Sequence, residues 1–283
     1  TAAMTSGTGL TEFSRELPDR FFDVGIAEGH AVAMAGGMAK QGLIPVFAVY
    51  SSFLQRGFDM LIHDISLDKL HAVFCVDRAG LVGADGQTHH GCFDPAYLTQ
   101  IPGMTVLCPA SFAELRDMLR YAICQVSGPV AIRYPRGGER DYAAASDPER
   151  CYITLQDGAD FTILSYGILI NEALKAAELL AEKGISVRVI KLNRIAPLSE
   201  ADVASMLSGT RRLLVLEDCI AAGCVGEKVS CLAALAGARL DKLVLKSCGD
   251  RLPNEGSVEE LDHALGLDAA SVAISIEEVL HEQ

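Results

Sequence analysis

Short apolar runs alternate with longer helical segments along most of the chain, and this alternation constrains the fold more than any other feature. Five runs rich in β-branched or aromatic residues lie in the first half, and four lie in the second. Segments with the apolar spacing of amphipathic helices separate them. Apolar strands that alternate with helices predict mostly parallel sheets covered on both faces. We therefore expect an α/β fold.

The boundaries of these elements divide the chain into two consecutive, mostly parallel-sheet α/β domains. The expected strands span residues 20–26, 44–50, 71–77, 104–110, 129–134, 160–167, 186–192, 211–218 and 242–248. The expected helices span residues 28–41, 53–68, 111–125, 171–184, 199–209 and 225–237. Ser111 with Glu114 predicts a capping box, and Gly184 predicts a helix end. Because residues 137–150 are polar and aperiodic, we interpret them as a linker and predict domains at 1–145 and 146–283.

Charge and cysteine content narrow the class of protein. The chain has 37 acidic and 24 basic residues among 283, a net charge of −13, which argues against non-specific nucleic-acid binding. Its nine cysteines form no CxxC pair, so we expect reduced, mostly buried thiols in a cytoplasmic protein. No apolar run approaches the ~20 residues that a membrane helix requires. We expect neither a nucleic-acid partner nor a membrane partner.

A carboxylate in apolar surroundings, Glu28, is the first candidate for chemistry. It follows the run at 20–26 and opens the next helix among Gly, Ala, Ile, Val and Met. A helix N-terminus favours the ionised carboxylate, whereas desolvation favours the neutral acid. A carboxyl group between these tendencies can exchange a proton with a bound base. The alternative is a solvated glutamate at a helix start.

Aromatic and cationic side chains follow the second expected strand. Tyr50, Phe53 and Arg56 are three residues apart, so a helical turn would place them on one face. An aromatic platform beside a guanidinium group suits a flat cofactor and an anion. The same residues also fit an ordinary helix start with one core aromatic side chain and one solvated arginine.

The third expected strand ends in a glycine-rich loop, residues 77–94, with many titratable side chains. They are Asp77, Arg78, Asp85, His89, His90 and Asp94. Ligands bind at the carboxyl ends of parallel strands, and imidazoles titrate near neutral pH. Histidine and aspartate also bind metals, but the adjacent side chains of His89 and His90 tend to point apart, so we predict no metal site. A purely structural loop is the other alternative.

Arg136 lies at the end of the fifth expected strand, in the sequence RYPRGG. Together with Arg78 it would be able to clamp a phosphate, since guanidinium groups bind phosphate through paired hydrogen bonds. A surface arginine beside the linker is the alternative. The chain has neither a GxGxxG sequence after a strand nor a Walker A sequence.

The segments RFFDVGIAEGHAV, VYSSFLQRGFDMLIHD, DRAGLVGADGQTHHGCFD and RYPRGG follow one another in this order. Together they resemble the 1-deoxy-D-xylulose-5-phosphate synthase family, thiamine diphosphate enzymes related to transketolase. The resemblance extends beyond residue 270 and implies a transketolase-like pyrimidine-binding domain followed by a transketolase C-terminal domain. The family's first domain, with its GDG…N sequence, has no counterpart here. Three positions, Gly29, Cys224 and Glu255, depart from the family's pattern.

The resemblance implies a role for each candidate. Glu28 matches the glutamate that hydrogen-bonds the cofactor's aminopyrimidine, on which Phe53 would stack and which Ile26 would contact. Arg78 and Arg136 match the arginines that bind the substrate phosphate. The side chains expected along the substrate channel are Tyr50, Arg56, Asp85 and His89, and we expect Asp85 and His89 to be catalytic.

The resemblance also implies a reaction. Pyruvate would lose CO₂ and join D-glyceraldehyde 3-phosphate through a thiamine diphosphate enamine, in a homodimer whose first domain binds Mg²⁺. We expect this chain, which starts at TAAM, to be the C-terminal part of such a protein and inactive without its N-terminal domain. The alternatives are a separate subunit of a split transketolase, the β chain of a 2-oxo acid dehydrogenase, or a domain pair retained for assembly.

Overall fold

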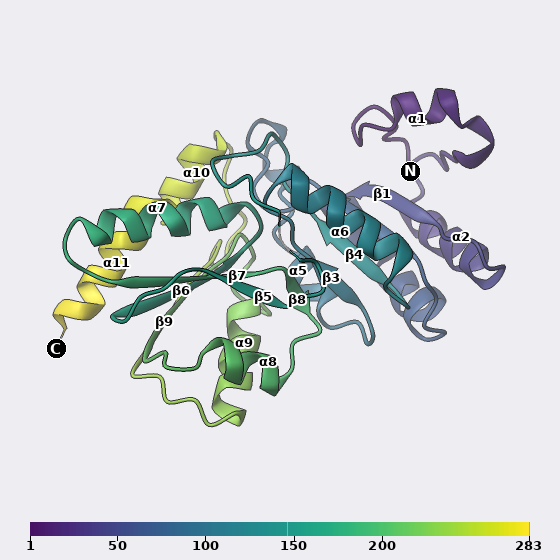
Figure 1. Ribbon diagram of the computed structural model, residues 1–283. Helices are drawn as coiled ribbons and strands as arrows, with labels where there is room; N and C mark the ends of the chain where they lie inside the picture. The colour runs from purple at the N-terminus through teal and green to yellow at the C-terminus, as the bar shows by residue number, and fades with distance from the viewer. Residues whose placement is uncertain (146, 283) are drawn as a thin grey trace.

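The computed structural model describes residues 1–145 and 147–282, which form two α/β units, each built on a five-stranded sheet (Figure 1). The first sheet has the order β1 (Val46–Tyr50), β2 (Val73–Asp77), β4 (Val130–Arg133), β3 (Thr105–Leu107) and β8 (Arg194–Ala196). The second has the order β10 (Lys242–Lys246), β9 (Arg212–Leu216), β6 (Phe161–Tyr166), β7 (Val187–Leu192) and β5 (Tyr152–Gln156). In each sheet four strands are parallel and one edge strand, β8 or β5, is antiparallel. The α/β fold class is therefore confirmed.

Helices cover both faces of each sheet (Figure 1). The first sheet has α6 (Phe112–Cys124) on one face and α2 (Glu28–Lys40) on the other, together with α3 (Ser51–Leu54), η2 (Gln55–Gly57), α4 (Phe58–Met60) and the π-helical η3 (Leu61–Ser66). The second has α7 (Ile170–Ala181), α10 (Val258–Ala264) and α11 (Ala269–His281) on one face, and α8 (Glu200–Met206) and α9 (Val225–Leu235) on the other. The shorter elements are α1 (Thr11–Glu16), η1 (Pro18–Arg20), η4 (Gly83–Asp85), η5 (Gln87–His89), α5 (Asp94–Leu98) and η6 (Gly167–Leu169).

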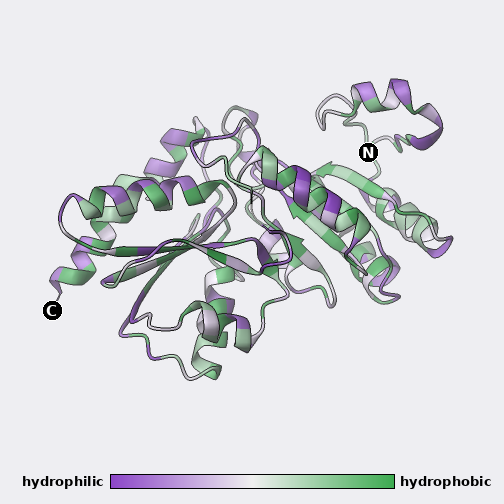
Figure 2. Cartoon of the chain, viewed as in Figure 1, coloured by the Kyte–Doolittle hydropathy of each residue, from purple (hydrophilic) through white to green (hydrophobic). Residues whose placement is uncertain are grey.

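Alternation of side chains along the strands divides the core into three apolar clusters. On β1, Phe47 and Val49 face one side of the sheet, and Ala48 faces the other beneath α6. The amphipathic helices α6 and α7 show the matching pattern, with apolar and polar residues interleaved along their length (Figure 2). The cluster with Phe47 also contains Leu164 and Val215 of the second sheet. One core therefore runs through both halves of the chain.

Eight of the nine expected strands are present, and the strand expected at 20–26 is wrong. That segment pairs with no other strand in the described structure; Phe22 and Ile26 are exposed, at 51% and 82%, while Val24 packs against the core. The Asp23 carboxylate accepts hydrogen bonds from the backbone N–H groups of Ala3 and Gly25, which turns the chain locally. Apolar content alone did not form a strand here, because a strand also requires a neighbour to pair with.

The sequence patterns also missed two strands and the C-terminal helices. The strand β5 is only partly buried and has no continuous apolar run, and β8 has three residues. The helices α10 and α11 do carry N-cap signals, since Ser257 and Asp268 each accept a backbone hydrogen bond from the first turn. The expected helix at 53–68 begins earlier, at Ser51, and ends in π-helical geometry.

Glu114 connects the two units instead of completing the expected capping box. Ser111 accepts the hydrogen bond from Glu114 N as predicted, but the Glu114 carboxylate accepts from Ala110 N. The same carboxylate lies 3.0 Å from Lys191 Nζ of β7, and both side chains are fully buried. Tyr142, in the expected linker, donates its hydroxyl to Glu114 as well. The predicted domain boundary falls at residue 146, outside the described residues, and stays a prediction.

All nine cysteines are free thiols, as expected, and only Cys124 and Cys231 are exposed. Cys92 and Cys248 lie 3.6 Å apart at their sulfur atoms, where the first unit meets the second. Across residues 1–145 and 147–282, no helix is long and apolar enough to cross a bilayer.

Candidate active site

Side chains at the carboxyl edge of the first sheet form the candidate active site. The strand β1 ends at Tyr50 and β2 ends at Asp77, and these two residues are partners in the parallel register. Arg78 follows directly. A phenol, a carboxylate and a guanidinium group are thus brought side by side at the edge where ligands of parallel sheets bind.

Glu28 begins α2, and the structure buries its carboxylate, which is one of the two interpretations that the sequence left open. The residue is 3% exposed. Arg56 NH1 donates to Glu28 Oε1 at 3.0 Å, whereas the side chain of Arg56 itself is 63% exposed. The solvated alternative is therefore wrong for Glu28, and its partner is a cation that can move into solvent.

Phe53 joins the remaining candidates. Its ring stacks on that of Tyr50 with centroids 5.3 Å apart, and it meets His89 edge-on at the same distance. The guanidinium carbon of Arg56 lies 5.9 Å from the Phe53 centroid. The three-residue spacing of Tyr50, Phe53 and Arg56 thus places them on one face, as expected.

Arg78 is held tightly, in a backbone conformation that costs energy. Its φ of +57° lies in the left-handed region, which for a non-glycine residue costs roughly 1–3 kcal/mol. Its guanidinium carbon lies 3.8 Å from the Tyr50 ring centroid, and NH1 donates to Asp77 Oδ2 at 2.8 Å. Burial raises the pKa of Asp77, and the charge and hydrogen bonds of Arg78 oppose that rise.

Asp85 lies between the two arginines that the sequence predicts to bind phosphate. Its Oδ2 is 3.5 Å from Arg78 Nε and its Oδ1 is 3.2 Å from Arg136 NH1. Arg78 Nε is buried, and within the described part of the chain it makes no hydrogen bond. An internal carboxylate therefore bridges two guanidinium groups, one of which keeps an unused donor.

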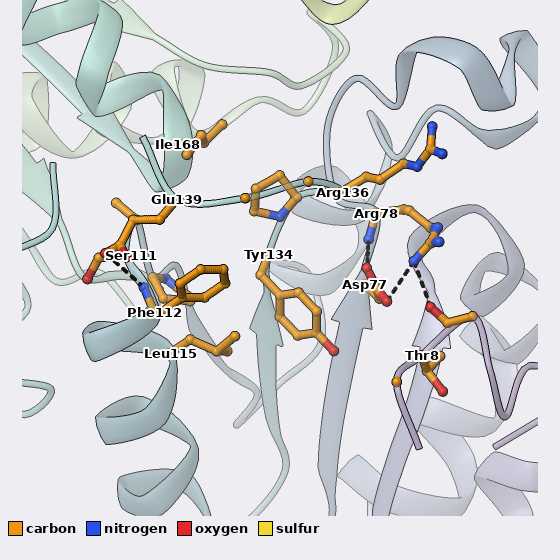
Figure 3. A pocket seen from close by; sticks show the side chains of 17 residues that line it. Thr8, Asp77, Arg78, Ser111, Phe112, Leu115, Tyr134, Arg136, Glu139 and Ile168 are labelled. Carbon is orange, nitrogen blue, oxygen red and sulfur yellow. Dashed lines mark hydrogen bonds and ion pairs between the residues drawn. The ribbon is translucent and has the colours of Figure 1, made fainter. Parts of the chain in front are cut away.

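Both arginines border a cavity of about 320 Å³, on one side of which Figure 3 shows them together. The cavity is also lined by residues that sequence reasoning did not select, chiefly Gly7, Thr8, Gly9, Phe112, Tyr134 and Glu139. The Gly7 carbonyl accepts a hydrogen bond from Arg78 NH1 at 3.0 Å. Two glycines around one threonine, near the start of the chain, were a signal for this close backbone approach.

Two further predictions concern His90 and Ile26. The side chains of His89 and His90 point apart, as expected: His90 is buried, and its Nδ1 accepts a hydrogen bond from Val82 N. Ile26 is 82% exposed and takes part in none of the contacts above, so its cofactor role stays a prediction. In the described ranges, no three His, Cys, Asp or Glu side chains are placed to hold one metal ion.

Two departures from the family's pattern lie close to these groups. A Cβ on Gly29 would meet Met60 Cε at 2.8 Å, so Met60 fills the space that a larger residue at position 29 would need. Glu255 Oε1 lies 3.5 Å from the Cβ position of Gly86, so the C-terminal unit contacts the loop that holds Asp85.

Comparison with protein families identifies both units. Residues 1–140 match the family model described as "Transketolase, pyrimidine binding domain", and residues 152–272 match "Transketolase, C-terminal domain". The chain belongs to the transketolase family. The pair of domains that the resemblance implied is therefore confirmed.

Relatives of this transketolase-family chain are named 1-deoxy-D-xylulose-5-phosphate synthase. Those of Halalkalibacterium halodurans, Chlorobium luteolum and Clostridium kluyveri are 44%, 42% and 43% identical over 99%, 98% and 99% of this chain. The chain spans less than half of their length, 45%, 44% and 45% respectively. A solved structure described as "Split gene transketolase, inactive beta4 tetramer" superimposes with a TM-score of 0.86 at 26% identity, covering 99% of this chain and 91% of that one.

Proposed function

We propose that this chain is the C-terminal portion of a 1-deoxy-D-xylulose-5-phosphate synthase. Such an enzyme joins pyruvate, with loss of CO₂, to D-glyceraldehyde 3-phosphate. The convergence of a buried Glu28, the Phe53 platform and the Arg78–Arg136 pair at one sheet edge carries the proposal. Relatives of that name, at 42–44% identity over nearly the whole chain, support it.

The residues present fit the pyrimidine half of thiamine diphosphate. Glu28 offers a desolvated carboxylate that can hold a proton at a ring nitrogen, and its Oε1 becomes available when the exposed Arg56 moves away. Phe53 offers an aromatic ring beside Arg56, the ion-pair partner of Glu28, and Ile26 would be a further contact for the cofactor. When bound, thiamine diphosphate supplies the carbanion chemistry, while the protein sets the protonation.

The described residues do not fit the rest of the cofactor. They contain no cluster of three or more His, Cys, Asp or Glu side chains that could hold Mg²⁺. We infer that a domain outside this chain holds Mg²⁺ and the diphosphate.

The arginine pair suits the phosphate of the acceptor. Two guanidinium groups facing one cavity can each bind phosphate oxygens, and the unused Arg78 Nε supplies a further donor. Asp85 has to withdraw from them, since a carboxylate and a phosphate repel each other at this distance. Tyr50 and His89, which flank Phe53, would then line the path to the aldehyde carbon, and His89 would move a proton at its carbonyl oxygen.

We expect the chain to be inactive alone and to act as part of a cytoplasmic homodimer. The related split-gene transketolase, of which this chain covers 91%, is described as an inactive tetramer, which supports inactivity of these two domains by themselves. The curated relatives are about twice as long as this chain, which favours one continuous protein over a separate subunit.

A chimera tests the function. The N-terminal part of the Halalkalibacterium halodurans enzyme that this chain does not match is fused to residue 1, and product formation from pyruvate and D-glyceraldehyde 3-phosphate is measured by mass spectrometry. We expect 1-deoxy-D-xylulose 5-phosphate from the chimera and none from the chain alone. A folded chimera that binds thiamine diphosphate but forms no product, while the parent enzyme does, would overturn the proposal.

A further inference from the structure

A buried series of polar side chains joins the C-terminal unit to the candidate active site. Asp218, two residues beyond β9, has its Oδ1 3.0 Å from NH2 of Arg133, the last residue of β4. Arg133 Nε donates to Asp94 Oδ2 at 2.7 Å, and Ser51 Oγ donates to Asp94 Oδ1 at 3.0 Å. Ser51 begins α3, the helix that carries Phe53. The series thus reaches from one unit to the aromatic platform of the other.

Asp218 and Ser51, at the two ends of this series, also lie against the base of the loop that holds Asp85 and His89. We call this base, formed by Gly80 and Gly91, the neck. Gly80 and Gly91 exchange two backbone hydrogen bonds of 2.8 and 2.7 Å, which close the loop at its base. A Cβ on Gly80 would lie 2.1 Å from Asp218 Oδ2, and a Cβ on Gly91 would lie 2.7 Å from Ser51 Oγ. The neck is therefore held between a carboxylate of the C-terminal unit and a hydroxyl of the first.

The burial of these charges indicates a role in fixing geometry. Asp94 is fully buried and Arg133 is 2% exposed, so one guanidinium group serves two carboxylates without solvent. Burial raises the pKa of Asp94, and Arg133 opposes that rise. A buried ion pair often stabilises a protein no more than apolar residues of similar volume would, whereas the loss of one partner is costly. We therefore expect these buried charges to fix the positions of the segments that they join more than to stabilise the fold.

We propose that Asp218 is a positioning residue for the acceptor site. Through Arg133 and the glycine neck it holds the base of the loop, so that Arg78, whose carbonyl oxygen lies against Gly91, keeps its guanidinium group at the cavity and His89 meets Phe53. The C-terminal unit thereby contributes to acceptor binding without touching the acceptor. The inference rests on the proposed function for the identity of the acceptor, but its structural part can be tested separately.

The test compares two variants of the 283-residue chain, Asp218→Asn and Lys191→Met. Each removes one charge from the C-terminal side of a buried ion pair between the units, but only Asp218 contacts the loop neck. In Asp218→Asn we expect amide hydrogen exchange across residues 81–90 to accelerate about tenfold, because the loop opens locally. The dissociation constant for inorganic phosphate, measured by calorimetry, should rise about tenfold, since small displacements of binding groups are costly. In Lys191→Met neither value should change.

Gly80→Ala provides a second route to the same result. Its added methyl group would displace Asp218 from the loop side, at a residue with a φ of +78°, so it should reproduce the exchange and phosphate effects even if Asp218→Asn does not fold. Unchanged exchange at 81–90 in both loop variants, or an equal change in Lys191→Met, would show that Asp218 has no positioning role. If the unmodified chain binds no phosphate, the arginine clamp of the proposed function fails, while the exchange comparison still decides this inference.

Discussion

The carboxyl edges of the two sheets are built alike, but the hydrogen bonding of their charged groups differs. At the first edge, Arg78 and Arg136 border a cavity and both pair with Asp85, while Arg78 also pairs with Asp77. At the second, Glu217 follows β9 and accepts hydrogen bonds from Tyr166 Oη at 2.9 Å and from the backbone N–H groups of Val225 and Gly226 at 2.9 and 2.8 Å. A helix N-terminus readily binds an anion, and here α9 binds the chain's own carboxylate.

This difference shows that a strand end can carry a fully hydrogen-bonded charge, as at Glu217, or a charge with a donor still unused, as at Arg78; we call the edge at Glu217 closed and the edge at Arg78 open. Glu217 is 1% exposed and its carboxylate is fully used by the second unit. Arg78 keeps a buried donor without a hydrogen bond within the described chain, and Arg136 remains 40% exposed at its side chain. The fold alone thus does not decide where a charged group keeps an unused donor, because the two sheets share the fold.

The largest effect is expected at the open edge, from Glu28→Gln in the chimera. The change keeps the shape of the side chain but removes its ability to hold and release a proton, so turnover should fall by about 10²–10⁴-fold while thiamine diphosphate still binds. Steady-state kinetics and calorimetry measure the two quantities. Thermal unfolding of the variant is the control for folding, and unchanged turnover in a folded variant would contradict the assigned role.

At the closed edge, Glu217→Gln should reduce stability. One amide oxygen cannot replace a carboxylate that serves three donors, so we expect the free energy of unfolding to fall by about 2–3 kcal/mol. Urea titration gives this value. Asp241→Asn, which breaks an exposed ion pair with Arg211 in the same unit, is the matched control and should cost under about 1 kcal/mol. Equal losses in the two variants would mean that the closed edge contributes little.

Asp262 of α10, which lies between the two edges, should make the stability of the chain depend on pH. It borders a second cavity with Arg140, Asp218 and Glu259, and burial raises its pKa from 3.8 to about 7, an effect that Arg140 opposes and Glu172 reinforces. Because the folded-state pKa is raised, protonation stabilises the fold, and this contribution is lost as the pH rises through about 7. Relative to Asp262→Asn, the wild-type chain should lose roughly 3 kcal/mol of unfolding free energy between about pH 5 and about pH 8. Parallel pH profiles of the two proteins would refute this titration.

The smallest effect concerns thiol reactivity. Cys124 and Cys231 are exposed, whereas Cys219, Cys224 and Cys248 lie buried near the closed edge. Burial raises the pKa of the Cys224 thiol to about 12, which further slows its reaction. Titration with a chromogenic disulfide should therefore show two fast thiols in the native chain and nine in denaturant. A larger fast phase would show that the second edge opens readily.

Most strands and several contacts of the candidate site were predictable because their signals are local, whereas β5, β8, α10 and α11 were missed. Eight strands followed from apolar runs, the N-cap at Ser111 followed from its position, and the shared face of Tyr50, Phe53 and Arg56 followed from helical spacing. The strand at 20–26 failed because an apolar run does not reveal whether a partner strand exists. For Ile26, the sequence did not indicate the exposure that the structure shows.

The sequence by itself determined the two α/β units, the family resemblance and the residue types that gather at one edge, since period, caps and motifs act over a few residues. Only the tertiary structure decided that Arg56 pairs with Glu28, that Asp85 bridges the arginines, and that β8 crosses to the first sheet. It also decided that Glu217 closes one edge while the other stays open. These are contacts between distant segments, and their formation depends on how the whole core packs, which no local spacing encodes.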